Sequence, residues 1–308
     1  MPGREHSGWI LVGPTAVGKT AVAQRIAAKQ KSVILSADAM LVYRGMDIGT
    51  AKPTAAERAA VKYLGLDLID PSETYSAGAW LENIRTLLPD APVIVAGGTG
   101  LYIKALLQGL DAEVRPDPGL RAELEAVAKE QGISSLQEKL RDEFPEWFAF
   151  VRDRENPRRL IRAFELARGG ARVPSAERPP PAANVTGLRM ERDDLNKRIA
   201  QRVDIMYQNG LLEEMRRLQG QYPHLSETAS RAIGYAEAAA VLAGQMKLAD
   251  AKEKTVMRTR QLAKRQMTWF RNQLCAEWID VKPGMDAGEV AEMVSRAWAA
   301  SGPGKLNV

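Results

Sequence analysis

One motif largely dictates how the N-terminal part of this chain must fold. The apolar run Trp9–Val12 is followed by a loop with the spacing G-x-x-x-x-G-K-T and then by the alanine-rich segment Thr20–Lys29. The glycines of such a loop let successive backbone N–H groups point at one anion, and the N-terminus of the following helix adds a positive partial charge. The loop consists of Gly13, Pro14, Thr15, Ala16, Val17, Gly18, Lys19 and Thr20.

This strand–loop–helix unit predicts a phosphate-binding site. Lys19 supplies a positive charge and Thr20 a hydroxyl ligand for Mg²⁺, the cofactor that we expect. Such a loop binds a di- or triphosphate moiety and does not discriminate between the groups attached to it. A glycine turn that binds nothing is the alternative.

The remainder of the first third alternates between strand and helix patterns. Strand candidates are Ser32–Leu35, Gly65–Ile69 and the β-branched run Pro92–Ala96, and Ala79–Leu88 has helical spacing. Such alternation implies right-handed crossovers and helices on both faces of a parallel sheet. The sequence therefore predicts an α/β fold with a P-loop NTPase-like parallel sheet core.

The composition changes near Arg115. Residues 117–167 are charged, rich in Ala and Leu and helical in period, and residues 168–187 are rich in Gly and Pro. We therefore expect a core formed by residues 1–114 and 188–308, interrupted by a helical insertion at 115–187. Leu188–Glu191 and Trp278–Val281 are strand candidates, and the tail after Ser301 is expected to fray.

Cysteine, histidine and apolar content exclude several classes of protein. The single cysteine, Cys275, rules out an intramolecular disulfide framework and a multi-cysteine zinc site, and the two histidines lie far apart. No stretch approaches the ~20 apolar residues that span a bilayer, and no signal peptide is recognisable. We expect a cytoplasmic monomer with no membrane association.

Positive charge is concentrated near the C-terminus. The formal net charge is +5, and Lys252–Arg271 contains seven basic residues against Glu253 as the one acid. A local field of this sign suits a phosphate-bearing partner, and a solvated helix face is the alternative.

The residues that follow the predicted strands limit the types of reaction that the site could catalyse. P-loop ATPases usually place an acid at the end of a buried strand to organise Mg²⁺ and water. Here Pro92–Ala96 runs into Gly97–Gly100 without an acid, and Asp38 follows the second strand instead. An acid at this position either holds metal, as in an NTPase or kinase, or acts as a base on an acceptor, as in a transferase.

Five further blocks are more specific than the phosphate loop. They are Asp38–Pro53, Gly97–Tyr102, Asn156–Glu165, Arg231–Tyr235 and Arg260–Trp269. In sequence and order they resemble the motifs of the tRNA dimethylallyltransferase family, also called tRNA isopentenyltransferases. The resemblance covers nearly the whole chain, from residue 13 to residue 271.

The resemblance implies a particular reaction and architecture. The family transfers a dimethylallyl group from dimethylallyl diphosphate to N6 of the adenosine 3′ to the anticodon, in tRNAs that read codons beginning with U. Its α/β core carries an inserted helical domain that grips the anticodon stem-loop. On this basis Lys19, the loop amides and Mg²⁺ would stabilise the departing diphosphate, and Asp38 would accept the N6 proton. Thr99 would lie near the reacting phosphate or amine.

The resemblance also implies binding residues. The diphosphate would be held by the phosphate loop and Arg231. The tRNA would contact Asp38, Ala39, Met40, Leu41, Thr99, Arg121, Arg158, Arg159, Leu160, Ile161, Arg162, Arg231, Arg260, Lys264 and Arg265. Residues 260 and 264 share a helix face, and 265 points elsewhere. Many family members have Ser at the position of Ala39 and Gln at that of Leu41, so those polar contacts are absent here.

Three other functions remain alternatives. An adenylate isopentenyltransferase shares the chemistry but uses a free nucleotide, and the insertion and the basic block argue against it. A small-molecule P-loop kinase fits the phosphate loop but does not explain the Asp38–Pro53 block. A non-catalytic RNA-binding protein would have no use for Lys19 and Thr20.

Overall fold

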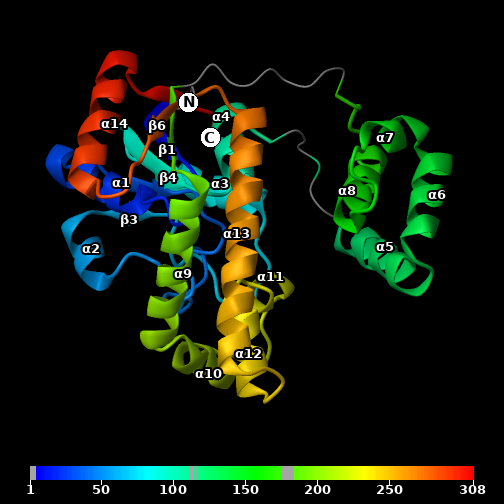
Figure 1. The fold of residues 1–308 in the computed structure, drawn as a ribbon. Coiled ribbons are helices and arrows are strands. Elements are labelled where there is room, and N and C mark those ends of the chain that lie inside the picture. The colour runs from blue at the N-terminus through cyan, green and yellow to red at the C-terminus, as the bar shows by residue number, and fades with distance from the viewer. Residues whose placement is uncertain (1–4, 111–113, 115–116, 175–183) are drawn as a thin grey trace. The chain divides into compact units, whose positions relative to one another are not determined.

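The chain forms two compact units in the computed structural model, which describes residues 5–110, 114, 117–174 and 184–308. Unit 1 comprises Met1–Gly109 and Pro180–Val308, and unit 2 comprises Leu110–Pro179. Figure 1 shows both. The expected insertion, 115–187, extends further at its C-terminal end than unit 2 does. The reason is that residues 185–187 already pair with the core strands on both sides.

Unit 1 is built on a sheet whose order is β3-β2-β4-β1-β5-β6, all parallel, with β7 antiparallel to β1. The strands are β1 (His6–Val12), β2 (Ile34–Ser36), β3 (Tyr63–Leu64), β4 (Val93–Gly97), β5 (Val185–Arg189), β6 (Ala276–Asp280) and β7 (Gly304–Leu306). The predicted α/β class with a parallel core is confirmed.

Helices cover both faces of this sheet, because alternate residues of its central strands point to opposite sides. On β1, Ile10 and Val12 belong to one buried cluster and Leu11 to another. The first cluster packs against α3 (Ala77–Leu87) and α4 (Gly100–Gln108), and the second against α1 (Lys19–Gln30) and α14 (Ala287–Ser301).

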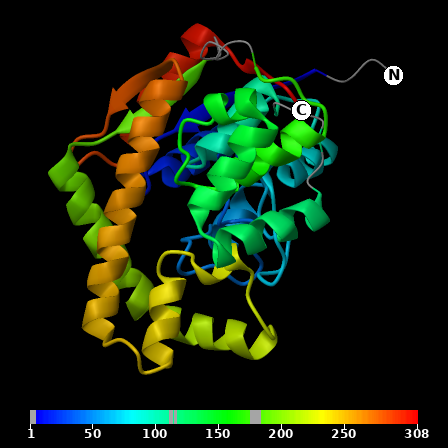
Figure 2. The same cartoon turned by 90° about the vertical axis from the view of Figure 1, so that its right-hand side faces the viewer.

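A helical extension projects from the sheet (Figures 1 and 2). The helices α9 (Arg192–Gln208) and α13 (Leu248–Gln273) run side by side. The other helices of unit 1 are α2 (Ala55–Ala60), α10 (Leu211–Gln221), α11 (Glu227–Ser230) and α12 (Tyr235–Leu242). Of these, α10 and α12 pack together at the far end of the extension.

Unit 2 consists of four described helices around a small core. They are α5 (Pro118–Glu130), α6 (Ile133–Glu143), α7 (Pro145–Phe150) and α8 (Pro157–Arg168). Leu124, Leu136, Leu140, Leu160 and Phe164 are all fully buried between them.

Two expectations about strands were wrong. β3 lies at Tyr63–Leu64, just before the expected Gly65–Ile69, because Gly65 has a φ of 81° and ends the extended run. The tail after Ser301 does not fray. It forms β7, which pairs with His6–Gly8 and leaves Leu306 only 3% exposed.

Candidate active site

The phosphate loop connects β1 to α1 at the carboxyl edge of the sheet. Gly13 has a φ of 151°, and a Cβ there would lie 2.6 Å from the carbonyl oxygen of Leu188, so the loop passes β5 at a distance that only glycine permits. Val17 is 1% exposed and anchors the loop in the core. Nζ of Lys19 donates to the carbonyl oxygen of Pro14 at 2.8 Å, so this side chain folds over the loop.

Two desolvated cations lie beside one carboxylate. Burial lowers the pKa of Lys19 to about 7, while the charge of Asp38 opposes this shift and that of Arg202 adds to it. Burial also lowers the pKa of Arg202, again against the effect of Asp38. Nη2 of Arg202 donates to the carbonyl oxygen of Thr50 at 3.2 Å. A phosphate-bearing ligand would supply the negative charge that this cluster lacks.

Sequence reasoning missed Arg202, although a signal existed. Arg202 is three residues after Ile199 and four before Met206, and both lie on the buried stripe of α9. An arginine on that stripe faces the interior and needs a partner there. The charged residue on this otherwise apolar stripe is therefore the sequence signal for Arg202.

Asp38 and Thr99 meet where the loops after β2 and β4 come together. Oδ1 of Asp38 accepts a hydrogen bond from the backbone N–H of Met40 at 2.9 Å. Oγ1 of Thr99 accepts from the N–H of Ala39 at 2.9 Å, and the N–H of Thr99 donates to the carbonyl oxygen of Ala37 at 3.1 Å. The Thr99 side chain therefore fixes the Asp38 loop and does not cap α4.

Gln266 of α13 joins this region to the phosphate loop. Its Oε1 accepts from the N–H of Thr15 at 2.8 Å, and its Nε2 donates to the carbonyl oxygen of Gly98 at 3.0 Å. A Cβ on Gly98 would lie 2.4 Å from that Nε2, and one on Gly100 would lie 2.3 Å from the ring of Trp269. The second glycine motif thus allows α13 to approach closely.

Two adjoining cavities meet at the Asp38 carboxylate. The larger, of about 1210 Å³, is lined by Lys19, Thr20 and Leu41, among others. The smaller, of about 490 Å³, is lined by residues that include Ala39, Met40, Thr99, Arg231 and Arg265. Both are lined by Thr15, Asp38, Thr50, Arg202, Met206 and Gln266. The phosphate loop and the Asp38–Thr99 region are therefore brought together as predicted.

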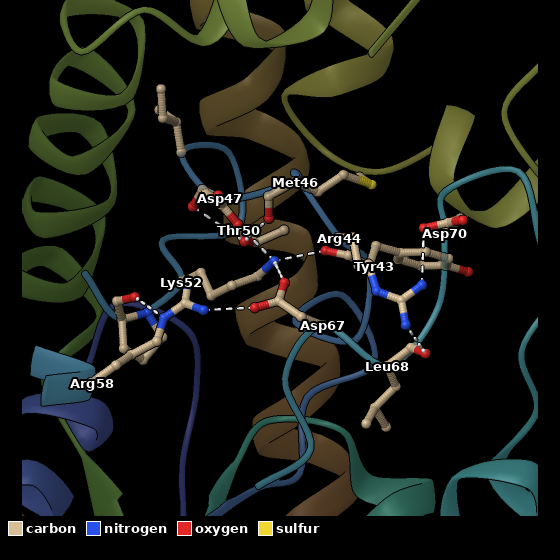
Figure 3. Close-up of polar contacts among 12 residues, drawn as sticks. Tyr43, Arg44, Met46, Asp47, Thr50, Lys52, Arg58, Asp67, Leu68 and Asp70 are labelled. Atoms are coloured by element: carbon tan, nitrogen blue, oxygen red, sulfur yellow. Dashed lines mark hydrogen bonds and ion pairs between the residues drawn. The ribbon is translucent and has the colours of Figure 1, made fainter. Parts of the chain in front are cut away.

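The segment between Asp38 and Pro53 is held by buried charges that sequence reasoning did not identify. Figure 3 shows Nζ of Lys52 among Oδ1 of Asp47 at 2.7 Å, Oδ1 of Asp67 at 2.6 Å and the carbonyl oxygen of Tyr43 at 2.6 Å. From the other side, buried Glu214 accepts hydrogen bonds from the N–H groups of residues 47 and 48. This segment carries Thr50, the acceptor for Arg202.

Similarity to known proteins shows the family of this chain. A family model described as IPP transferase matches residues 41–273. The chain belongs to this family. The tRNA dimethylallyltransferase of Deinococcus radiodurans is 38% identical over 279 residues, which cover 87% of this chain and 90% of that protein. The one from Bacillus subtilis is 38% identical over 290 residues, 90% of this chain and 91% of that protein.

A solved IPP transferase structure shows the same fold. The tRNA isopentenylpyrophosphate transferase of Bacillus halodurans superposes with a TM-score of 0.63 at 33% identity, covering 95% of this chain and 96% of that one. The family predicted from the sequence motifs is confirmed. Among the described residues, no helix has the length and apolar character needed to cross a membrane.

The family motif in unit 2 separates into surface and core residues. The side chains of Leu160 and Ile161 are 0% and 3% exposed and belong to the core of unit 2, so a tRNA contact at these two positions stays a prediction and would involve the backbone. Arg158 and Arg159 are exposed on the same helix.

Two other arginines of unit 2 share one buried carboxylate. Arg121 forms a two-pronged pair with Glu165 at 2.9 and 3.0 Å, and Arg162 contacts the same carboxylate at 3.0 Å. Glu165 is 2% exposed, whereas the arginine side chains are 42% and 36% exposed. Both arginines stabilise unit 2, and part of each side chain remains exposed.

The basic residues of α13 point in two directions, as their spacing predicted. Arg265 lines the smaller cavity, whereas Arg260 and Lys264 line a separate groove. Arg231 also lines the smaller cavity, with its side chain 73% exposed and ion-paired to Glu227 at 2.6 Å. It does not line the larger cavity with Lys19 and Thr20. This position suits an RNA contact better than the expected diphosphate contact.

The residues around Thr20 fit Mg²⁺ held mainly by a substrate. Among the described residues, no three or more His, Cys, Asp or Glu side chains gather as a metal cage. Thr20 is exposed to the larger cavity, which Asp38 also lines. Mg²⁺ commonly keeps several waters and binds substrate phosphates with one or two protein oxygens, and Thr20 and Asp38 offer such oxygens.

Proposed function

We propose that this protein transfers a dimethylallyl group from dimethylallyl diphosphate to N6 of the adenosine 3′-adjacent to the anticodon, in tRNAs that read codons beginning with U, with release of diphosphate. Membership of the IPP transferase family and the names of its relatives support this reaction. The observation that carries it is the position of Asp38, which lines both the cavity of the phosphate loop and the cavity of Thr99 and Arg265.

The larger cavity is the donor site in this proposal. The loop amides, Lys19 and Arg202 would bind the diphosphate, and binding would restore the positive charge of Lys19. Mg²⁺ held by Thr20 and the phosphate oxygens would supply further positive charge to the leaving group. Fixed charges of this kind stabilise the transition state without reorganisation, because they are already in place when the C–O bond breaks.

The smaller cavity would receive the adenine. The N6 amine is a weak nucleophile, because its lone pair is delocalised into the ring. As N6 forms a bond to the allylic carbon and the C–O bond to diphosphate breaks, one N6 proton passes to Oδ2 of Asp38, which forms no hydrogen bond with the part of the chain that the structure describes. The base must leave its stack to enter such a cavity, at a cost of a few kcal/mol.

The anticodon stem-loop would be held by exposed basic residues. Arg231 and Arg265 border the adenine cavity, and unit 2 offers Arg158, Arg159 and the exposed parts of Arg121 and Arg162. We propose that the protein acts as a monomer in the cytoplasm, where its RNA substrate is available. Splayed loop bases together with phosphate contacts are the usual means of recognising such RNA.

A transfer assay with radiolabelled dimethylallyl diphosphate tests the proposal. The acceptors are an anticodon stem-loop RNA and free AMP in parallel, and ATP hydrolysis is followed alongside. We expect label in the RNA and not in AMP. Label in AMP alone would indicate a free-nucleotide enzyme, and phosphate release from ATP without any label would indicate a kinase or ATPase.

The same assay tests the role of Asp38. Asp38→Asn keeps the side-chain size and the Oδ1 contact with Met40 but removes the base. We expect transfer to fall by a factor of roughly 10² to 10⁴, as for loss of other general bases, while stem-loop binding remains close to normal. Turnover within a few fold of the parent would exclude Asp38 as the proton acceptor.

A further inference from the structure

A turn of the backbone at the active site encloses a buried carboxylate from a helix distant in sequence. The consecutive N–H groups of Asp47 and Ile48 donate to the Glu214 carboxylate of α10 at 3.1 and 3.0 Å, and the Tyr235 hydroxyl donates to it at 2.5 Å. That hydroxyl also accepts from the N–H of Gly49 at 3.2 Å. Glu214 is 1% exposed and Tyr235 is 0% exposed. A carboxylate so buried needs these donors in place of water, so the turn and the carboxylate hold each other in position.

The turn forms part of the walls of the active site, whereas the groups that hold it do not. Thr50 lines both cavities, and Gly49 lines the smaller one. Neither Glu214 nor Tyr235 is among the described residues that line them. An effect of these two side chains on a ligand in either cavity must therefore pass through the turn.

Arg202 is the charged group that the turn orients. Within the part of the chain that the structure describes, its one hydrogen-bond partner is the carbonyl oxygen of Thr50, which accepts from Nη2 at 3.2 Å. The hydroxyl of Thr50 donates to the carbonyl oxygen of Met46 at 2.6 Å and so closes the turn. On the other side, a Cβ on Gly49 would lie 2.4 Å from the Tyr235 ring, so the turn has no room to move toward α12. The direction of the guanidinium is thus set by a carbonyl group that is itself fixed.

We propose that Glu214 is a positioning residue: it fixes the Thr50 carbonyl through the turn and thereby directs the Arg202 guanidinium at a diphosphate in the larger cavity. The identity of that ligand rests on the proposed function. A guanidinium binds phosphate most strongly in a defined, two-pronged orientation, and a misplacement of about 1 Å can cost about 100-fold in activity. Loss of Glu214 therefore weakens diphosphate binding although this side chain does not meet the ligand.

The test is a double-mutant cycle with Arg202, measured by calorimetric binding of inorganic diphosphate to the full chain in the presence of Mg²⁺. Its members are the parent, Glu214→Gln, Arg202→Met and the double variant. Glu214→Gln keeps the size of the side chain but turns an NH₂ group toward the donors of the turn. The matched control is Glu213→Gln, which removes a carboxylate from the preceding position of α10, where the side chain is 65% exposed.

We expect Glu214→Gln to weaken diphosphate binding roughly tenfold in the parent background, the loss of about one hydrogen bond to a charged group. In the Arg202→Met background it should change the dissociation constant less than about twofold, because the group that it positions is gone. Glu213→Gln should bind as the parent does. Equal weakening by Glu214→Gln in both backgrounds, or no weakening in the parent background, overturns the proposal.

The same measurement separates positioning from a structural role. A loosened fold reduces the number of binding sites that calorimetry counts, but it leaves the dissociation constant of the folded molecules unchanged. Tyr235→Phe is the second variant, because it keeps the buried ring and removes only the hydroxyl that contacts Glu214 and Gly49. We expect roughly threefold weaker diphosphate binding with a full number of sites. If Glu214→Gln does not fold, Tyr235→Phe decides, and a parent dissociation constant in that variant overturns the proposal.

The transfer assay separates this inference from the proposed function. If the parent shows the coupling between Glu214 and Arg202 but transfers no dimethylallyl group, the positioning role stands and the proposed function fails. If the parent transfers the group but the losses from Glu214→Gln and Arg202→Met simply add, the proposed function stands and the positioning role is overturned.

Discussion

Replacement of Lys52 by Met should destabilise unit 1 by about 3 kcal/mol. The Lys52 side chain is 0% exposed and contacts Asp47, Asp67 and the carbonyl oxygen of Tyr43 (Figure 3). Removing one partner of a buried ion pair costs about 3–5 kcal/mol. The lower end applies here, because Asp47 and Asp67 are 49% and 30% exposed and Asp67 keeps Arg58 at 2.6 Å.

Hydrogen exchange of backbone amides is the suitable assay, because a chain with two compact units need not unfold in one transition. A loss of about 3 kcal/mol corresponds to exchange roughly 150-fold faster for the most protected amides of β2 and β4. The matched control is Arg44→Met. Arg44 holds the same segment through Asp70, but the two side chains are 51% and 41% exposed and screened by solvent, so its loss should leave the exchange rates close to those of the parent.

The reasoning is refuted if the Lys52→Met protein exchanges within tenfold of the parent, or if Arg44→Met accelerates exchange as much. In the first case the buried ammonium would contribute no more than a surface ion pair. In the second, the segment would depend on its general attachment and not on the buried charge.

Three further predictions concern the active site. Gln266→Leu removes the two hydrogen bonds to Thr15 and Gly98, worth about 1 kcal/mol each, so kcat for transfer should fall roughly tenfold or more with an unchanged circular dichroism spectrum. Gly100→Ala should lower kcat/KM on the order of tenfold, because the new Cβ would lie 2.3 Å from the Trp269 ring, whereas Gly220→Ala, with nothing within 4 Å, should have no effect. Binding of dimethylallyl diphosphate at pH 8 should take up close to one proton, because Lys19 with a pKa of about 7 is mostly neutral before binding and becomes charged beside phosphate. Calorimetry in buffers of different ionisation enthalpy measures this proton uptake. Proton uptake that persists in the Lys19→Met variant would contradict the assignment to Lys19.

Local patterns allowed much of unit 1 to be predicted from the sequence. The apolar run at Trp9, the glycine loop and the helix after it are adjacent in the chain, so their spacing alone determines the phosphate site. Asp38 and Thr99 follow strands that the sequence also indicated, and carboxyl ends of parallel strands share one edge of a sheet.

The missed residues act through contacts that are distant in sequence. Gln266 is 251 residues from Thr15, and Glu214 is 166 residues from Ile48. Nothing in the local pattern of either residue identifies such a partner. Leu160 and Ile161 show a different limit: the family motif includes them, but it does not reveal that their side chains lie on the apolar face of α8 in the core of unit 2.

The contacts of Gln266 would couple the proposed donor and acceptor sites. One amide side chain contacts the phosphate loop through Thr15 and the Asp38–Thr99 region through Gly98, and it projects from the helix that carries Arg265. A displacement of α13 by an RNA ligand would therefore move the donor loop and the acceptor cavity together. If Gln266 transmits this coupling, saturating stem-loop RNA should tighten binding of inorganic diphosphate in the parent and should lose that effect in Gln266→Leu, with reciprocal tightening of RNA by diphosphate required by linkage.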